Sequence, residues 1–324
     1  MNPFSQHDAT GRLRHLTTLE GLSADEIRQI LDRAQGFLRA PGQLPARART
    51  LEGITVANMF TEPSTRTRAS FELATRRLGG DPVNLDISLS SRQKGETVLD
   101  TIYTLQAMSV DVFVIRDAEP NVCQYVAEHV QEHVSVVSAG EAHLSHPTQG
   151  LLDALTVLQY KGGFRDLVVA IVGDIRHSRV ARSTCQALTA LEVGDLRLVA
   201  PEALMPDADE LPQASRYHAL DAGIAHADVV MMLRIQKERL NTVSIPSDEE
   251  YFKQWGLNRA RLKLARPEVI VMHPGPMNRG IEIASDVADG PSSVIRQQVT
   301  NGVAVRMAVL ETLIENRMSR WGQA

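Results

Sequence analysis

The 324-residue sequence is poor in cysteine, in aromatic residues and in long apolar runs. Its two cysteines, Cys123 and Cys185, are too few for a disulfide framework and are typical of a reducing compartment. The longest apolar runs, such as residues 167–172, fall far short of the roughly 18 residues that a membrane span needs. The N-terminal segment is polar and lacks the apolar core of a secretory signal. These absences predict a cytoplasmic protein without membrane spans.

The sequence also lacks an excess of basic residues. It contains 34 Lys and Arg against 39 Asp and Glu, a formal net charge of −5, which argues against nucleic acid or an anionic membrane as a general partner. Any site for an anionic ligand must therefore be built locally. With 43% hydrophobic and 23% charged residues the composition is that of a globular protein, and its length predicts two domains.

Short β-branched runs alternate with segments of helical period, which predicts an α/β fold of two doubly wound parallel-sheet domains. The predicted strands are residues 54–60, 111–115, 134–137, 167–172, 196–200, 228–233 and 269–272.

The series of strands is interrupted near residues 146–150, and we place the domain boundary there. The first domain is expected to comprise residues 1–147 and the second residues 148–292. A last helical segment, about residues 293–317, is expected to pack back onto the first domain.

Unusual polar clusters follow the carboxyl ends of five predicted strands. They are residues 61–68, Arg116, residues 173–179, Arg234 and residues 273–280. Ligands of open α/β sheets bind at that edge. The convergence of the clusters therefore indicates a binding site more strongly than any single motif does.

The first cluster reads TEPSTRTRAS, residues 61–70. Pro63 and Ser64 suit the start of a helix, and Gly79–Gly80 suits its end. This places Ser64, Thr65, Arg66 and Thr67 around a helix N-terminus, where backbone N–H groups and the helix dipole favour an anion. The hydroxyls and the guanidinium would complete a phosphate cradle. An ordinary helix cap with solvated arginines fits the same segment.

Three further candidates are weaker when taken singly. The polar segment at residues 88–97 predicts a mobile loop before a helix at residues 98–108, although it also reads as a solvated charge run. His146 and Gln149, placed just before a helix, could bond a carbonyl and an amide, although a His–Pro turn is more often structural. Arg179 and Arg234 would each suit a carboxylate, as would many surface arginines.

Two motifs point to other chemistry. HVQEH at residues 129–133 matches a pattern of zinc peptidases, but it is predicted mid-helix, with Val122 and Val126 on nearly the same face as both histidines, which favours packing. VVAIVGDIRHS resembles the start of a dinucleotide-binding unit, yet it supplies only Gly173 where three glycines are needed.

Together the clusters resemble a known family. PSTRTRASFE, residues 63–72, closely resembles the carbamoyl-phosphate signature of the carbamoyltransferases, and HPTQ, residues 146–149, resembles their second signature. The resemblance extends in order from about residue 14 to residue 315.

Within that family the sequence is similar to the aspartate enzymes. These carry S-x-x-x-K-G-E, as at residues 90–96, and R-x-Q-K-E-R, as at residues 234–239. Ornithine enzymes typically have HCLP near the C-terminal end and lack the lysine. This chain has HPGP at residues 273–276, where many members have HPLP. Gly275 is expected to change the stiffness of this loop and thereby the affinity for aspartate.

The resemblance implies transfer of a carbamoyl group from carbamoyl phosphate to the amine of L-aspartate, giving N-carbamoyl-L-aspartate and phosphate, an early step of de novo pyrimidine biosynthesis. It implies an active site in the cleft between the domains. It also implies a reaction that needs no cofactor and no metal. It also implies a homotrimer with shared active sites, which in some members joins a larger assembly with regulatory or dihydroorotase-like chains.

The resemblance further implies roles for individual residues. The catalytic residues would be Arg66, Thr67, Arg116 and His146. Carbamoyl phosphate would be bound by Ser64, Thr65, Arg66, Thr67, Arg116, His146 and Gln149. Aspartate would be bound by Lys94, Arg179, Arg234, Gln236, Gly275 and Pro276, with Ser90 and Lys94 entering from a neighbouring subunit. Three alternatives stay open: a different amine acceptor, a catalytically silent assembly subunit and a zinc peptidase.

Overall fold

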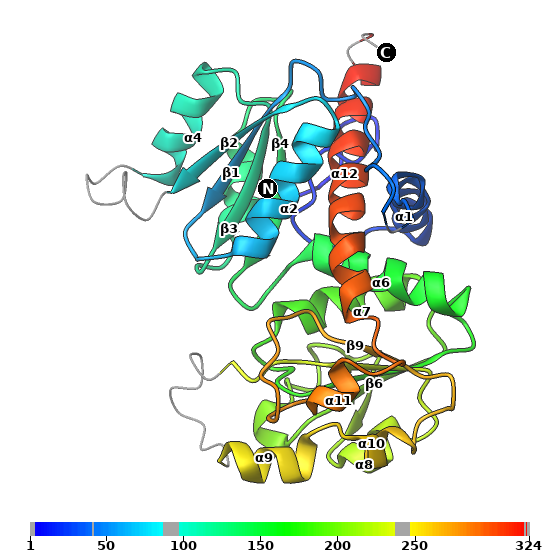
Figure 1. Ribbon diagram of the computed structural model, residues 1–324. Helices are drawn as coiled ribbons and strands as arrows, with labels where there is room; N and C mark the ends of the chain where they lie inside the picture. The colour runs from blue at the N-terminus through cyan, green and yellow to red at the C-terminus, as the bar shows by residue number, and fades with distance from the viewer. Residues whose placement is uncertain (1–3, 41, 87–96, 237–246, 321, 323–324) are drawn as a thin grey trace. The chain divides into compact units, whose positions relative to one another are not determined.

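The computed structural model describes residues 4–40, 42–86, 97–236, 247–320 and 322. The chain forms two compact units. Unit 1 comprises Met1–Gly21, Arg28–Thr148 and Thr300–Ala324, and unit 2 comprises Leu22–Ile27 and Gln149–Val299. Each unit contains a parallel sheet and helices (Figure 1), which confirms the predicted α/β class with two parallel-sheet domains. No helix in the described part of the chain has the length and apolar character that crossing a membrane requires.

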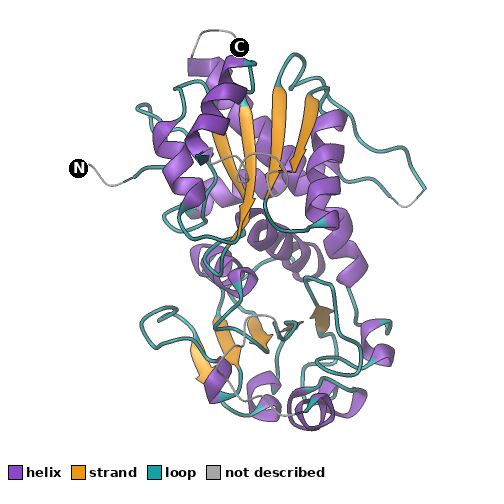
Figure 2. Ribbon diagram, turned by 90° about the vertical axis from the view of Figure 1, so that its left-hand side faces the viewer, coloured by secondary structure: helices purple, strands orange, loops and turns teal. Residues whose placement is uncertain are grey.

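The sheet of unit 1 has four parallel strands in the order β2-β1-β3-β4. They are β1 (Thr55–Phe60), β2 (Asp81–Asp86), β3 (Val112–Asp117) and β4 (Ser135–Glu141). The helices that lie wholly or mostly in this unit are α1 (Ala24–Phe37), α2 (Thr65–Arg77), α4 (Val98–Ala107), α5 (Val122–His129) and α12 (Ile295–Arg320). Figure 2 shows helices on both sides of these strands. Strands covered on both faces are buried along most of their length, as β1, β3 and β4 are.

The sheet of unit 2 has five parallel strands in the order β7-β6-β5-β8-β9. They are β5 (Val168–Val172), β6 (Asp195–Val199), β7 (Ser215–Tyr217), β8 (Val229–Met232) and β9 (Ile270–Met272). The α-helices are α6 (Pro147–Lys161), α7 (Arg179–Ala190), α8 (Leu220–Ile224), α9 (Asp248–Trp255), α10 (Arg259–Leu262) and α11 (Ser285–Ala288), and a 3₁₀ turn, η2, covers Glu202–Leu204. Its core is built from the apolar side chains of these strands and of the helices around them.

In each sheet, successive strands are added first on one side of the first strand and then on its other side. β1 lies between β2 and β3, and Phe60 at its end is in register with Arg116 of β3. β5 lies between β6 and β8, and Val172 at its end is in register with Met232. Such a reversal leaves a crevice outside the carboxyl ends of the two strands, where ligands of doubly wound sheets bind.

The seven predicted strands are all present, whereas β2 and β7 were not predicted. β2 reads DPVNLD and β7 reads SRY, and both lie at sheet edges, where proline and polar residues are tolerated. Two predictions about helix ends are wrong. α6 begins at Pro147, so Gln149 lies within its first turn rather than before it, and α5 ends at His129, so the HVQEH segment is not mid-helix.

Glu141 ends β4 and caps α5. Its Oε1 accepts the backbone N–H of Cys123 at 2.6 Å, in the first turn of α5. Asp117 ends β3 in register with Glu141, so two carboxyl groups share this edge of the sheet. Burial raises the pKa of Glu141 and the charge of Asp117 raises it further, against the hydrogen bonds from Cys123, which lower it.

We expect Glu141→Gln to stabilise the protein at neutral pH and to have less effect as the pH falls. Because the pKa of Glu141 is raised in the folded state, its contribution to stability is fully present below the ordinary value of 4.5 and is lost as the pH rises through the raised pKa. Glutamine keeps an oxygen acceptor for the Cys123 N–H and cannot ionise.

Thermal unfolding measured at several pH values tests this expectation. Glu128→Gln, at an exposed position on α5, the helix that Glu141 caps, is the matched control and should show no such pH-dependent gain. A Glu141→Gln variant that loses the same stability at every pH would show that the negative charge itself is needed for the cap.

Candidate active site

The predicted phosphate cradle lies at the N-terminus of α2. The helix begins at Thr65, with Ser64 as its N-cap residue, directly after the end of β1. Its first turn contains no acidic residue, and among the described residues the Ser64 hydroxyl caps no backbone N–H. Thr67 is buried, whereas Thr65 and Arg66 are exposed. Hydroxyls and a guanidinium therefore lie together at a helix N-terminus, an arrangement that suits an anion.

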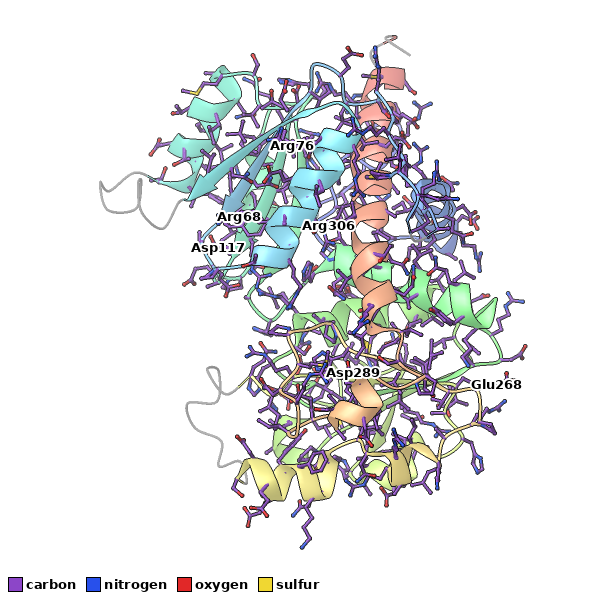
Figure 3. All side chains as sticks on the ribbon, in the orientation of Figure 1. Arg68, Arg76, Asp117, Glu268, Asp289 and Arg306 are labelled. Atoms are coloured by element: carbon purple, nitrogen blue, oxygen red, sulfur yellow. The ribbon has the colours of Figure 1, made fainter. Side chains whose placement is uncertain are left out.

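A cavity of about 440 Å³ opens beside this segment, within the usual size of small-molecule sites. It is lined by Phe60, Thr61, Glu62, Pro63, Ser64, Thr65, Arg68, Ala69 and Glu72. The guanidinium of Arg68 lies over the Phe60 ring, 5.3 Å from its centroid. This contact holds the Arg68 side chain against the wall of the cavity. Figure 3 shows Arg68 near the start of α2 and Arg76 near its end.

Arg116 lies beside the end of β1. Its backbone oxygen accepts hydrogen bonds from the N–H of Thr61 at 3.0 Å and from the Thr61 hydroxyl at 3.2 Å, which ties the loop after β1 to β3. Its guanidinium donates to the oxygen of Ala139 at 3.3 Å, and its Nε lies 3.3 Å from Oε2 of Glu62. An anion that binds Arg116 therefore competes with the Glu62 carboxylate, a partner that was not predicted from the sequence.

The HPTQ segment is almost entirely buried. His146 is 5% exposed and directly precedes α6. The turn before it is closed by the N–H of Glu141, which donates to the oxygen of Ser145 at 2.8 Å. Gln149, in the first turn of α6, donates from Nε2 to Oδ1 of Asp153 at 3.0 Å. The side chain of Gln149 is thereby held in one orientation.

The acceptor-side candidates in unit 2 gather at the ends of β5 and β8. Arg179 is the first residue of α7 and is 7% exposed, whereas Arg234, after β8, is half-buried. Gln236 donates from Nε2 to the backbone oxygen of His177 at 2.9 Å. The structure thus brings Arg179, Arg234 and Gln236 to one edge of the sheet.

Asp174 ties these two loops together. Its side chain is fully buried. Oδ1 lies 2.8 Å from Nδ1 of His177, and Oδ2 accepts the backbone N–H of Gln236 at 3.3 Å. Asp174 lies within the predicted polar cluster of residues 173–179, but no role was predicted for it from the sequence. A carboxylate directly after a buried strand, in the same loop as a predicted arginine ligand, was the available signal.

The loop after β9 carries Gly275 and Pro276, which are joined by a cis peptide bond. Gly275 has φ of +62°, a conformation that favours glycine and explains the residue at this point of HPGP. Its N–H donates to Nδ1 of His273 at 2.8 Å. Oε1 of Glu282 lies 3.2 Å from Nε2 of His273 and accepts the N–H of Asn278 at 2.5 Å. Buried side chains therefore determine the shape of this loop.

Ser90 and Lys94, predicted to enter the site from a neighbouring subunit, lie outside the described residues. So does the K-E-R part of the R-x-Q-K-E-R motif, residues 237–239. The structure thus places the cradle and Arg116 in unit 1, and Arg179, Arg234 and Gln236 in unit 2.

The surroundings of His129 and of the two cysteines favour structural roles for these side chains. Nδ1 of His129, the last residue of α5, lies 2.7 Å from the backbone oxygen of Tyr125. Among the residues that the structure describes, no group of three His, Cys, Asp or Glu is placed to hold a metal ion. Both cysteines are buried, and burial raises the pKa of Cys123 and raises that of Cys185 to about 12, which disfavours a reactive thiolate at either.

Two family models match the chain. Residues 14–159 match the carbamoyl-P binding domain of aspartate/ornithine carbamoyltransferase, and residues 165–313 match its Asp/Orn binding domain. Together the two matches cover nearly the whole chain.

Solved structures of both kinds of enzyme resemble this one. Aspartate transcarbamoylase from Trypanosoma cruzi in complex with carbamoyl phosphate is 30% identical, with a TM-score of 0.84 over 95% of this chain and 98% of that one. Ornithine carbamoyltransferase from Pyrococcus furiosus is 30% identical, with a TM-score of 0.82 over 93% and 97%. That from Thermus thermophilus is 28% identical, with a TM-score of 0.82 over 93% and 99%. Overall similarity therefore does not separate the two acceptors.

Proposed function

Because the chain belongs to the aspartate/ornithine carbamoyltransferase family, we propose that it transfers the carbamoyl group of carbamoyl phosphate to the amine of L-aspartate. The products are N-carbamoyl-L-aspartate and phosphate, which places the reaction in pyrimidine biosynthesis. The observation that carries the choice of acceptor is the position of Arg179 and Arg234 at the ends of β5 and β8. Two guanidiniums complement the two carboxylates of aspartate, whereas ornithine would bring a cationic side chain to them.

Carbamoyl phosphate is assigned to the first domain, residues 1–147. Ser64, Thr65, Arg66 and Thr67 hold the phosphate at the N-terminus of α2, and Arg116 contacts both the phosphate and the carbonyl oxygen. The assignment is supported by the cavity along this segment and by the absence of an acidic residue from the first turn of α2. Arg116 exchanges its Glu62 partner for the substrate anion.

The second domain, residues 148–292, is assigned to aspartate. Arg179, Arg234 and Gln236 grip the carboxylates, and backbone groups of Gly275 and Pro276 contact the rest of the substrate. The buried contacts of Asp174 and Glu282 support this role, because they hold the loops after β5, β8 and β9 in a defined shape before the substrate arrives.

The chemistry is acyl transfer to an uncharged amine. The amine lone pair attacks the carbamoyl carbon, a tetrahedral oxyanion forms, and the bond to the phosphate oxygen breaks. Arg66, Thr67, Arg116 and His146 supply donors to the developing oxyanion and to the leaving group, while Gln149 binds the carbamoyl amide. The departing phosphate accepts the proton of the amine. The reaction requires neither a metal nor a cofactor.

The active unit proposed is a homotrimer in which Ser90 and Lys94 of one subunit complete the site of its neighbour. Larger assemblies with regulatory or dihydroorotase-like chains would build on that trimer. A cytoplasmic location fits the reducing compartment that the low cysteine content indicates.

Carbamoyl transfer by the purified chain, with aspartate and ornithine offered separately and the ureido product quantified, tests the proposal. We expect product with aspartate alone, because Arg179 and Arg234 complement the two carboxylates of aspartate. Product with ornithine alone would overturn the choice of acceptor and leave the phosphate site standing. If neither amine reacts while carbamoyl phosphate still binds, the proposed acceptor is wrong for the isolated chain.

A further inference from the structure

A chain of buried hydrogen bonds in unit 2 begins at Asp153 of α6, whose side chain is fully buried. Its Oδ1 accepts the amide of Gln149 at 3.0 Å and the amide of Gln298 at 2.8 Å. Its Oδ2 accepts the hydroxyl of Thr184, from α7, at 2.9 Å. One carboxyl group therefore holds Gln149, the residue assigned to the carbamoyl amide, and also a glutamine of α12.

Gln298 extends this series of hydrogen bonds to the loop after β9, which carries Gly275 and Pro276. It is 2% exposed, and its Oε1 accepts the backbone N–H of His273 at 2.9 Å. Because Nδ1 of His273 accepts the N–H of Gly275, the proton of the imidazole is on Nε2, which donates to Glu282. The backbone next to Gly275 is thus anchored on one side by Gln298 and on the other by Glu282.

The amide of Gln298 has one usable orientation. Its Nε2 faces the oxygen of Asp153 and its Oε1 faces the N–H of His273. Turning the amide over would oppose two donors at His273 and two acceptors at Asp153, and buried mismatches of this kind are costly. The position of the His273 backbone is therefore fixed relative to the carboxyl group that orients Gln149.

We propose that Gln298 is a positioning residue for the acceptor side of the site. It ties the loop of Gly275 and Pro276 to Asp153, the same buried group that holds Gln149, so that the contacts to the carbamoyl group and to the acceptor are kept in one arrangement. The inference rests on the proposed function, since Gln149 and the loop are assigned to substrates there. Gln298 is itself buried and acts through these partners.

Gln298→Met tests this role. Methionine keeps the length and apolar stem of the side chain but cuts the link between Asp153 and His273, and leaves the bond from Gln149 to Asp153 in place. We expect the KM for aspartate to rise about tenfold, as loss of a buried hydrogen-bonded link predicts. The dissociation constant for carbamoyl phosphate, measured without aspartate, should change by less than about twofold.

The matched control is Thr184→Val, which removes a hydrogen bond to the same carboxyl group but does not touch Gln149 or Gln298. It should leave the KM for aspartate unchanged. Equal effects of the two variants on KM would overturn the proposal, because the loss would then follow from disturbing Asp153 in general. If Gln298→Met does not fold, Gln298→Asn keeps the amide but is one methylene too short to reach both partners, and the same results are expected of it.

Hydrogen exchange of the ligand-free protein separates this inference from the proposed function. In Gln298→Met the amides of Gly275 and Asn278 should exchange about tenfold faster than in the wild type, and in Thr184→Val they should not. This readout needs no substrate, so it holds even if aspartate is the wrong acceptor. Unchanged exchange in Gln298→Met would show that Gln298 does not position the loop.

Discussion

Arg66→Ala is expected to lower kcat about a thousandfold while changing the KM for aspartate much less. Arg66 lies in the first turn of α2, as part of the cradle, and is exposed rather than buried in the core. Its guanidinium would meet negative charge that develops on the phosphate and on the carbamoyl oxygen during transfer. An interaction that strengthens in the transition state affects kcat rather than ground-state binding.

Arg76→Ala is the matched control for this prediction. Arg76 lies near the other end of α2 (Figure 3), and its side chain is 62% exposed and paired with Glu72. Its removal takes the same charge from the same helix and should leave kcat within about twofold of the wild type, because surface ion pairs contribute little. Steady-state kinetics in which Arg66→Ala changes only KM would contradict a role in the transition state.

The predictions from sequence succeeded where one segment carries the whole signal. β1, β3 and β5 are apolar runs followed by polar clusters, and both features can be read within about ten residues. β2 escaped because an edge strand needs no continuous apolar run, and its Pro82 argues against a strand. The helix start at Ser64 was predictable because the residues that form an N-terminus are adjacent in sequence.

The buried partners of the site were not predictable in the same way. Asp153 and Gln298 are 145 residues apart in sequence, and neither lies in a motif that has chemical meaning by itself. Asp174 and Gln236 are separated by 62 residues and meet because β5 and β8 are neighbours in the sheet. Sequence patterns report which side chains could contact a ligand, whereas the groups that orient those side chains depend on strand order.

Asp174→Asn is the second variant for which we expect a large loss, about a hundredfold in kcat/KM for aspartate. The Asp174 carboxyl group accepts from His177 on one oxygen and from the Gln236 N–H on the other. Asparagine replaces one of these acceptors by a donor, so a buried N–H is left facing another donor. The loop after β8, which carries Arg234 and Gln236, would then lose its tie to the loop that precedes Arg179.

Asp228→Asn separates this effect from a general loss of stability. Asp228 is also buried, and it accepts the N–H of Val168 at 2.9 Å, which joins β5 and β8 at their amino ends, away from the proposed acceptor site. Both variants remove a buried carboxylate, Asp228 between β5 and β8 and Asp174 between the loops that follow them, so both should lower the melting temperature. Only Asp174→Asn should raise the KM for aspartate, and the dissociation constant for carbamoyl phosphate should stay the same in both. If Asp228→Asn impairs aspartate use equally, the sheet as a whole, rather than the loop at its carboxyl edge, determines how the acceptor is held.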